Sequence, residues 1–174
     1  RRRSPGRVST CKQLNLPGRV IATRGSRWGH FQYEPPWASR CSPPQPVSIP
    51  GQTIYGDVVI ETDVVHTETP EQFACQERPA ADVIIQYLDY DCISAPVFIR
   101  FRRTGDSFRP LGMDGRKSLK KFFIDRKVLR NKRDSIPLLV DNNGILWIIG
   151  YTIADRVKVT GDTRRIVTLR VYQQ

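Results

Sequence analysis

Residues 97–134 read VFIRFRRTGDSFRPLGMDGRKSLKKFFIDRKVLRNKRD, which starts like a strand and then turns. In Thr104-Gly105-Asp106, a glycine that tolerates unusual backbone angles precedes an aspartate that can bond its own main chain. We therefore expect the strand to end there. From residue 100 to residue 133 the segment holds thirteen basic and three acidic residues, a net charge of +10.

A short helix is predicted in the second half of this segment. Leu119, Phe122 and Phe123 have the spacing of one apolar helix face, and Ser118 suits the N-cap position. Three lysines crowd the predicted first turn: Lys117, Lys120 and Lys121. Cations there oppose the helix dipole by about 0.3–1 kcal/mol each. A bound anion would remove this penalty, since helix N-termini and lysines both favour phosphate. The alternative is a solvated basic helix.

Thirteen positions of the region carry a family pattern, several of them glycine, proline or aromatic: Arg102, Arg103, Gly105, Asp106, Phe108, Pro110, Gly112, Lys117, Lys120, Phe123, Arg133, Pro137 and Gly150. On these residues, the run 99–160 resembles the C-terminal domain of tRNA(Ile)-lysidine synthetase. The close resemblance covers about a third of the chain, and residues 12–36 are similar, more loosely, to the segment before that domain.

The resemblance implies a fold shared with a module of the phenylalanyl-tRNA synthetase β subunit. It also implies a role in an ATP-dependent ligase that joins lysine to the wobble cytidine of tRNA(Ile). In that family, ATP and Mg are used by a catalytic domain with an SGGxDS loop, and residues 1–174 contain no SGG run. We therefore expect this chain to need no cofactor of its own. Its expected partners are tRNA(Ile), held at the acceptor stem, and the N-terminal catalytic domain of the same cytoplasmic protein.

Ten cations are expected to contact RNA: Arg100, Arg102, Arg103, Arg109, Arg116, Lys117, Lys120, Lys121, Arg130 and Arg133. Contacts to phosphate fix the register of a protein on nucleic acid without reading its sequence. Arg109 and Arg116 flank the loop and are candidates for either base-edge or backbone contacts. No catalytic or metal-binding residue is assigned.

The rest of the chain favours an α+β fold, mostly antiparallel sheet with one or two short basic helices. Residues 1–50 read as a basic lead, a hairpin and a proline-rich linker, and residues 51–174 as a β-rich tRNA-binding domain. Asn143-Gly144 between apolar runs predicts a hairpin. Strands are expected within residues 20–23, 28–33, 82–88, 136–140, 145–149, 151–159 and 165–171, and residues 53–66 read as strands with a bend at Gly56-Asp57.

The charge is segregated along the sequence. Residues 57–91 hold nine acids and one base, although the whole chain has a net charge of +11. This pattern predicts one face for a polyanion and another that repels it. No apolar run reaches the length of a membrane span, and no signal peptide is evident. Met113 is the only methionine, which suggests a processed chain or a piece of a longer protein.

Cysteine and histidine are sparse and scattered. The four cysteines form no CxxC pair, so a zinc site is not expected, and reduced thiols are favoured over disulfides. Two other functions stay open: a free-standing RNA-binding protein, and a nuclease using Asp89 and Asp91. For these aspartates we favour a capping role at a strand end. The oligomeric state is open, a homodimer included.

Overall fold

The computed structural model describes residues 13–16, 20–24, 29–33, 43–70 and 82–173. The chain divides into two compact units, residues 1–36 and 37–174. In the first unit, three antiparallel strands form one sheet in the order β1 (Gln13–Leu16), β2 (Val20–Arg24) and β3 (Gly29–Tyr33). The pairing of β2 with β3 confirms the predicted hairpin, although its turn lies outside the described residues. Strand β1 was not predicted.

Two larger sheets form the main body of the second unit, and a two-stranded sheet, described below, is the third sheet among its described residues. The five-stranded sheet has the order β13–β12–β11–β8–β4, formed by Thr152–Ile153, Gly144–Ile148, Leu138–Asp141, Phe98–Arg100 and Gln45–Pro46. The four-stranded sheet has the order β5–β6–β14–β7, formed by Gly51–Tyr55, Val58–His66, Arg165–Gln173 and Ile84–Asp89. All neighbouring strands are antiparallel. The predicted fold class is confirmed.

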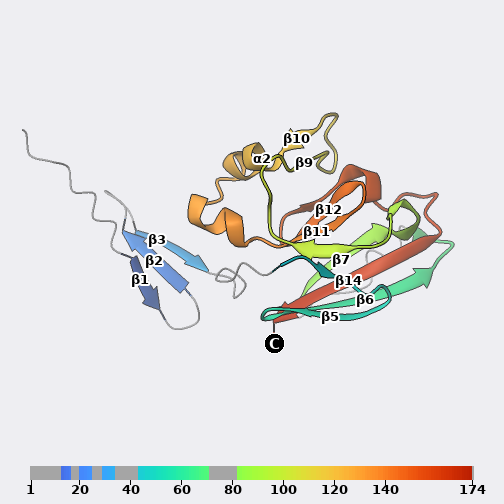
Figure 1. Ribbon diagram of the computed structural model, residues 1–174, viewed down its shortest axis with the longest axis horizontal. Coiled ribbons are helices and arrows are strands. Elements are labelled where there is room, and N and C mark those ends of the chain that lie inside the picture. Colours follow the sequence, from blue (N-terminus) through green and yellow to red (C-terminus); the bar gives the residue numbers. More distant parts are fainter. Residues whose placement is uncertain (1–12, 17–19, 25–28, 34–42, 71–81, 174) are drawn as a thin grey trace, which may run out of the picture. The chain divides into compact units, whose positions relative to one another are not determined.

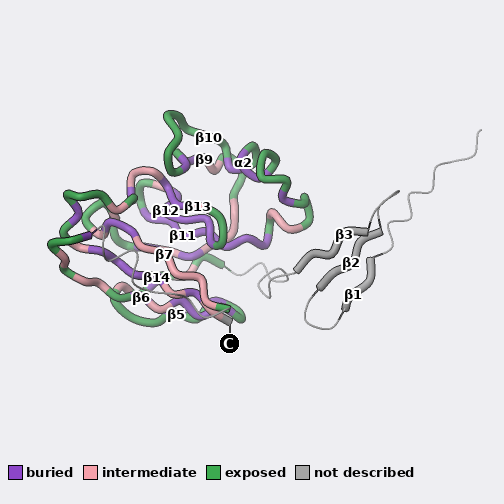
Figure 2. The backbone as a smooth tube through the Cα atoms, turned by 180° about the vertical axis from the view of Figure 1, so that it is seen from behind, coloured by how far each residue is buried: buried purple, intermediate pink, exposed green. Residues whose placement is uncertain are grey.

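One hydrophobic cluster joins the two sheets. It includes Leu139 and Trp147 from the five-stranded sheet and Ile60 and Leu169 from the four-stranded sheet, all almost fully buried. Figure 2 shows buried residues in the strands of both sheets. The residues predicted for the core from the hairpin around Asn143 are buried: Leu138, Leu139, Ile145, Trp147 and Ile149. The sheet layer under the basic segment is therefore a packed platform.

The hairpin between β11 and β12 forms as its sequence predicts. Asp141 Oδ1 accepts a hydrogen bond from the Asn143 backbone N–H (2.8 Å), an aspartate bond across a tight turn. Gly144 follows with φ +120°, which side chains disfavour. The turn chemistry fixes the strand register at Asp141 opposite Gly144.

The basic segment folds as a ribbon and a helix on this platform. A two-stranded sheet pairs β9 (Ser107–Phe108) with β10 (Lys117–Ser118), and α2 (Leu119–Asp125) follows directly. Ser118 Oγ accepts from the Lys121 backbone N–H (3.3 Å), which confirms the predicted N-cap. The predicted apolar face is buried as well. The 3₁₀ helix η3 (Arg130–Ser135) then leads into β11.

These elements lie together at one end of the second unit. In Figures 1 and 2, α2, β9 and β10 gather on the side away from β5 and β6. The acidic stretch 57–91 contributes β6 and β7 to the four-stranded sheet. The basic ribbon and helix thus lie apart from the described acidic strands β6 and β7. In the described part of the chain, no helix is long and apolar enough to cross a membrane.

The strand predicted over residues 151–159 is wrong beyond Ile153. The backbone N–H of Asp155 instead donates to the Arg109 carbonyl (2.9 Å), and the 3₁₀ helix η4 (Asp155–Val157) forms. A bridge between Pro110 and Ala154 ties this turn to the basic loop. The competing bonds come from a segment over forty residues away, so the local pattern could not predict the bend.

The proline-rich segment is partly folded into the sheet. Strand β4 lies at the sheet edge beside β8, where a proline needs no partner for its missing N–H. The Val47 backbone N–H donates to the Val97 carbonyl (2.9 Å), and the Val47 side chain is buried. The last residues of the predicted linker therefore belong to the second unit.

Candidate nucleic-acid interface

Arg100 and Asp106 form an ion pair at the turn where the basic segment leaves the five-stranded sheet. Arg100 Nη1 and Nη2 donate to the two carboxylate oxygens of Asp106, both at 2.9 Å, and each side chain is only 12% exposed. Nη1 also donates to the Phe101 carbonyl (2.9 Å). This bidentate pair holds the turn whose Gly105 has φ +90°. Arg100, one of the ten predicted RNA contacts, thus has its guanidinium paired within the protein.

Asp106 organises three parts of the segment at once. Its Oδ2 also accepts from the Arg103 backbone N–H (2.7 Å), and its carbonyl accepts from the Leu119 N–H at the start of α2 (2.8 Å). Burial raises the pKa of the carboxyl, but hydrogen bonds from Arg100 and the Arg103 N–H outweigh it and hold the pKa below its ordinary value. The Asp106 carboxylate therefore holds the turn, and its main-chain carbonyl holds the start of α2 against that turn.

Lys117 and Arg102 also pair within the protein. Lys117 Nζ lies 2.6 Å from Asp125 Oδ2, and its side chain is 18% exposed. The hydrogen bond from Lys117 lowers the pKa of Asp125. Arg102 Nε pairs with Asp134. The prediction that Lys117 sits in the first turn of the helix is wrong: it lies on β10, before the cap, and reaches the carboxylate at the far end of α2.

Five predicted cations are exposed and form no ion pair with any described residue: Arg103, Arg116, Lys120, Lys121 and Arg130. Lys120 and Lys121 occupy the first turn of α2, which contains no acid. Lys127, just after the helix, is exposed too. Arg126 stacks over the Phe122 ring at 5.6 Å from its centroid, and Arg133 Nε donates to the Val128 carbonyl (2.8 Å). The exposed, unpaired cations among the ten predicted contacts therefore remain available to a ligand.

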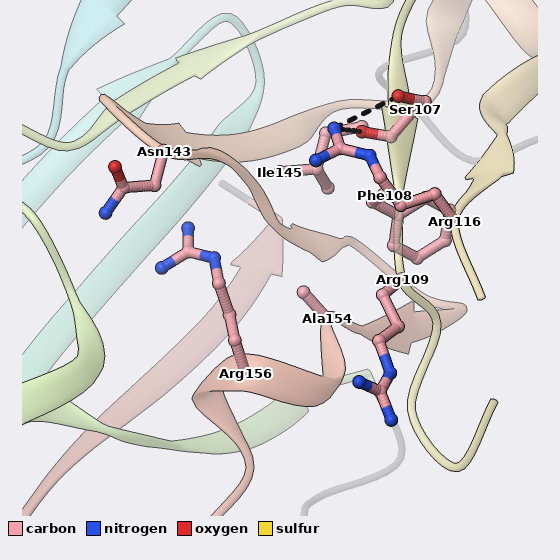
Figure 3. Close-up of a pocket in the computed structure, with 8 residues that line it drawn as sticks. All are labelled: Ser107, Phe108, Arg109, Arg116, Asn143, Ile145, Ala154 and Arg156. Carbon is pink, nitrogen blue, oxygen red and sulfur yellow. Dashed lines mark hydrogen bonds between the residues drawn. The ribbon is translucent and has the colours of Figure 1, made fainter. Parts of the chain in front are cut away.

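Arg109 and Arg116 line a pocket together with Arg156 of η4 (Figure 3). Its volume is about 90 Å³ and it is bordered also by Ser107 and Asn143. Arg109 is partly neutralised, because its Nε lies 3.6 Å from Asp155 Oδ2 and its Nη2 lies 3.4 Å from Asp114 Oδ1. In Figure 3 its guanidinium points away from those of Arg116 and Arg156.

The aspartates considered for nuclease chemistry serve the fold. Asp89 caps the 3₁₀ helix η2 (Tyr90–Cys92) by accepting from the Asp91 N–H (3.0 Å), and it also accepts from Thr163 Oγ1 (2.7 Å). Asp91 pairs with Arg165. The predicted capping role is confirmed for Asp89, whereas Asp91 forms an ion pair instead. Among the described residues, no three acids, histidines or cysteines come together as a metal site. Cys92 is a free, exposed thiol, and the other three cysteines lie outside the described residues.

Sequence reasoning missed two cations that the fold adds to this surface. Lys127 belongs to the basic run but is not among the ten predicted contacts, and its φ of +54° marks the end of α2. Arg156 lies over twenty residues beyond the run, and only the β12–β13 turn and η4 bring it to the pocket. No sequence signal identified it, because its neighbours there come from β9 and β11–β12.

Comparisons with known proteins agree with the sequence pattern. Residues 97–170 match the family model of the TilS substrate C-terminal domain. The tRNA(Ile)-lysidine synthase of Dehalococcoides mccartyi is 45% identical over 84 residues, 48% of this chain and 18% of that protein. The tRNA(Ile)-lysidine synthase of Symbiobacterium thermophilum is 30% identical over 190 aligned residues, 98% of this chain and 38% of that protein. The chain thus spans well under half the length of these relatives.

Two solved structures share the fold. A crystal structure of a TilS C-terminal domain aligns with a TM-score of 0.57 and 24% identity, covering 76% of this chain and 98% of that one. An N-terminal fragment of the phenylalanyl-tRNA synthetase β-subunit from Pyrococcus horikoshii aligns with a TM-score of 0.51 and 20% identity, covering 69% and 40%. Both likenesses expected from the sequence are confirmed at the level of the fold.

Proposed function

We propose that this chain binds tRNA, on the premise that residues 97–170 match the family model of the TilS substrate C-terminal domain. The proposed ligand is tRNA(Ile), held through the ribose-phosphate backbone of its acceptor stem. A-form RNA hides its major groove and is recognised mostly by shape and backbone contacts. The proposed binding surface combines five exposed cations around α2 with Arg116 on the loop before it; the five are Arg103, Lys120, Lys121, Lys127 and Arg130.

The observation that carries this proposal is the unpaired charge on α2. Two neighbouring lysines sit in a first turn without acids, where each weakens the helix slightly. Other cations of the segment, such as Arg100 and Lys117, are paired with nearby aspartates. The fold therefore neutralises some of its cations and leaves others exposed, as a surface for a polyanion requires.

We further propose that the chain acts within a larger cytoplasmic ligase. Its partner would be an N-terminal catalytic domain of the same protein, which would use ATP and Mg to join lysine to the wobble cytidine. The support is similarity to tRNA(Ile)-lysidine synthases, of which the chain covers 18–38%. In this role the chain positions tRNA and performs no chemistry itself.

A gel-shift titration at fixed salt tests the proposal. The chain is mixed with tRNA(Ile) and, separately, with an unrelated elongator tRNA, and a tRNA(Ile) acceptor-stem minihelix serves as a third ligand. We expect tighter binding of tRNA(Ile) than of the other tRNA, and binding of the minihelix. Equal affinity for both tRNAs would refute selection of tRNA(Ile), and no binding of any of them would refute the proposed function.

A further inference from the structure

The pocket between the β9–β10 ribbon and η4 is lined by three arginines and no acid. Its remaining walls are apolar or neutral, with Phe108, Ile145 and Ala154 forming the apolar part. A recess of about 90 Å³ is of the size of one small polar group rather than a nucleotide. Figure 3 shows Arg116 and Arg156 entering it from separate elements.

Arg116 is held in place but keeps donors free. Its Nη2 donates to Ser107 Oγ (3.2 Å) and, more weakly, to the Ser107 carbonyl (3.4 Å). No bond to a described residue uses its Nε or Nη1. A guanidinium has five N–H donors in one plane, so an edge of Arg116 remains for an oxyanion.

Arg156 is fixed more firmly on the other side. Its Nη1 donates to the Cys92 carbonyl (2.8 Å), and its Nη2 lies 2.6 Å from Asp141 Oδ1. The Asp141 side chain is fully buried and also accepts from the backbone N–H groups of Ser94 (2.9 Å) and Asn143 (2.8 Å). This network immobilises the guanidinium before any ligand arrives, which lowers the entropy cost of binding.

The charges around the pocket leave one positive charge uncompensated. Asp141 balances Arg156, while Asp114 and Asp155 balance Arg109. Arg116 has no acidic partner among the described residues. A phosphodiester carries one negative charge and presents oxygens that the planar arginine edge fits. We propose that this pocket binds a single phosphate group, supplied by the backbone of a bound RNA; the choice of RNA as the source rests on the proposed function.

Phosphate-ethylation interference with the full chain and tRNA tests this pairing of one residue with one phosphate. Arg116→Gln removes the charge at an exposed site, so the variant should keep the wild-type unfolding midpoint. The affinity of this variant for tRNA should be about tenfold lower than that of the wild type. One phosphate at which ethylation weakens wild-type binding should no longer have an effect, while the other sensitive phosphates should stay the same. Arg116→Lys should recover part of the affinity. Arg103→Gln, the matched control outside the pocket, should leave the effect at that phosphate in place.

Titration with inorganic phosphate separates the pocket from the RNA source. In NMR spectra of the arginine Nε–Hε groups, phosphate should shift Arg116 and Arg156 in the wild type, and the Arg156 shift should vanish in Arg116→Gln. An unchanged interference map without any phosphate shift overturns the proposal. A phosphate shift in a chain that binds no RNA upholds the pocket and refutes the proposed function. RNA binding with an unchanged map and no shift refutes the pocket alone.

Discussion

At the scale of single residues, Arg100 and Arg103 differ in their surroundings. Arg100 is paired with Asp106 at the corner, whereas Arg103 faces solvent three residues later. The sequence presents both simply as cations in a basic run. Burial separates them, because a buried charge must be paired and an exposed one need not be. A charged side chain therefore points to a ligand only where no other residue of the protein pairs with it.

Asp106→Asn should destabilise the protein near neutral pH. The amide cannot match the charged pair with Arg100, and removing hydrogen bonds of this kind costs about 1.5–3 kcal/mol. Because the pKa of Asp106 in the folded protein lies below its ordinary 3.8, the carboxylate stabilises the fold above that value. This contribution disappears as pH falls through the folded-state pKa.

Urea unfolding of wild type and variant at pH 7 and at pH 3 or below measures this effect. The difference in unfolding free energy should be large at pH 7 and shrink in acid. Asp114→Asn is the matched control, since Asp114 is exposed and its contact to Arg109 is 3.4 Å long. If both variants behave alike at pH 7, Asp106 does not hold the corner.

Lys117→Ala should leave the affinity for RNA unchanged, whereas Lys120→Ala should lower it. Lys117 Nζ is occupied by Asp125, whereas Lys120 is exposed and unpaired among the described residues. Because the Asp125 carboxylate is exposed, the loss of this ion pair should change stability little. Fluorescence titration with labelled tRNA at one salt concentration compares the two variants. Equal reductions in affinity would place Lys117 back in the interface.

At the scale of elements, α2 was predictable and its surroundings were not. The apolar spacing of Leu119, Phe122 and Phe123 and the cap at Ser118 are local, so the sequence specifies them. The same locality explains the correct hairpin at Asn143-Gly144. The bend at Asp155 and the arrival of Arg156 at the pocket depend on contacts between distant segments. Local sequence patterns do not reveal such contacts between distant segments.

Phe123→Ala should destabilise the second unit by about 3–5 kcal/mol. The Phe123 ring is 0% exposed and contacts the rings of Phe122 and Tyr151 edge to face. Ile124→Ala, at a neighbouring exposed position, is the control and should change stability little. Thermal and urea unfolding report both. A Phe123→Ala variant of normal stability would mean that α2 contributes little to the core.

At the scale of the whole molecule, the basic ribbon and helix and the described acidic strands lie in different parts of the second unit. The basic segment forms β9, β10 and α2, and the described acidic residues include those of β6 and β7 in the four-stranded sheet (Figure 1). Strand β14 of that sheet also carries Arg165 and Arg170 beside the acidic strands. A polyanion approaching from solution is attracted to the exposed cations of the basic segment.

The salt dependence of tRNA binding is the sharpest test of whether the exposed turn of α2 touches the RNA backbone. Removing one cation that contacts a phosphate should reduce the slope of log K against log salt concentration by about 0.7–0.9, so the double variant Lys120→Ala/Lys121→Ala should lower it by about 1.4–1.8. Lys117→Ala is measured beside it and should keep the wild-type slope. A double variant that also keeps the wild-type slope would refute the proposed interface, because the two lysines would then lie away from the phosphates.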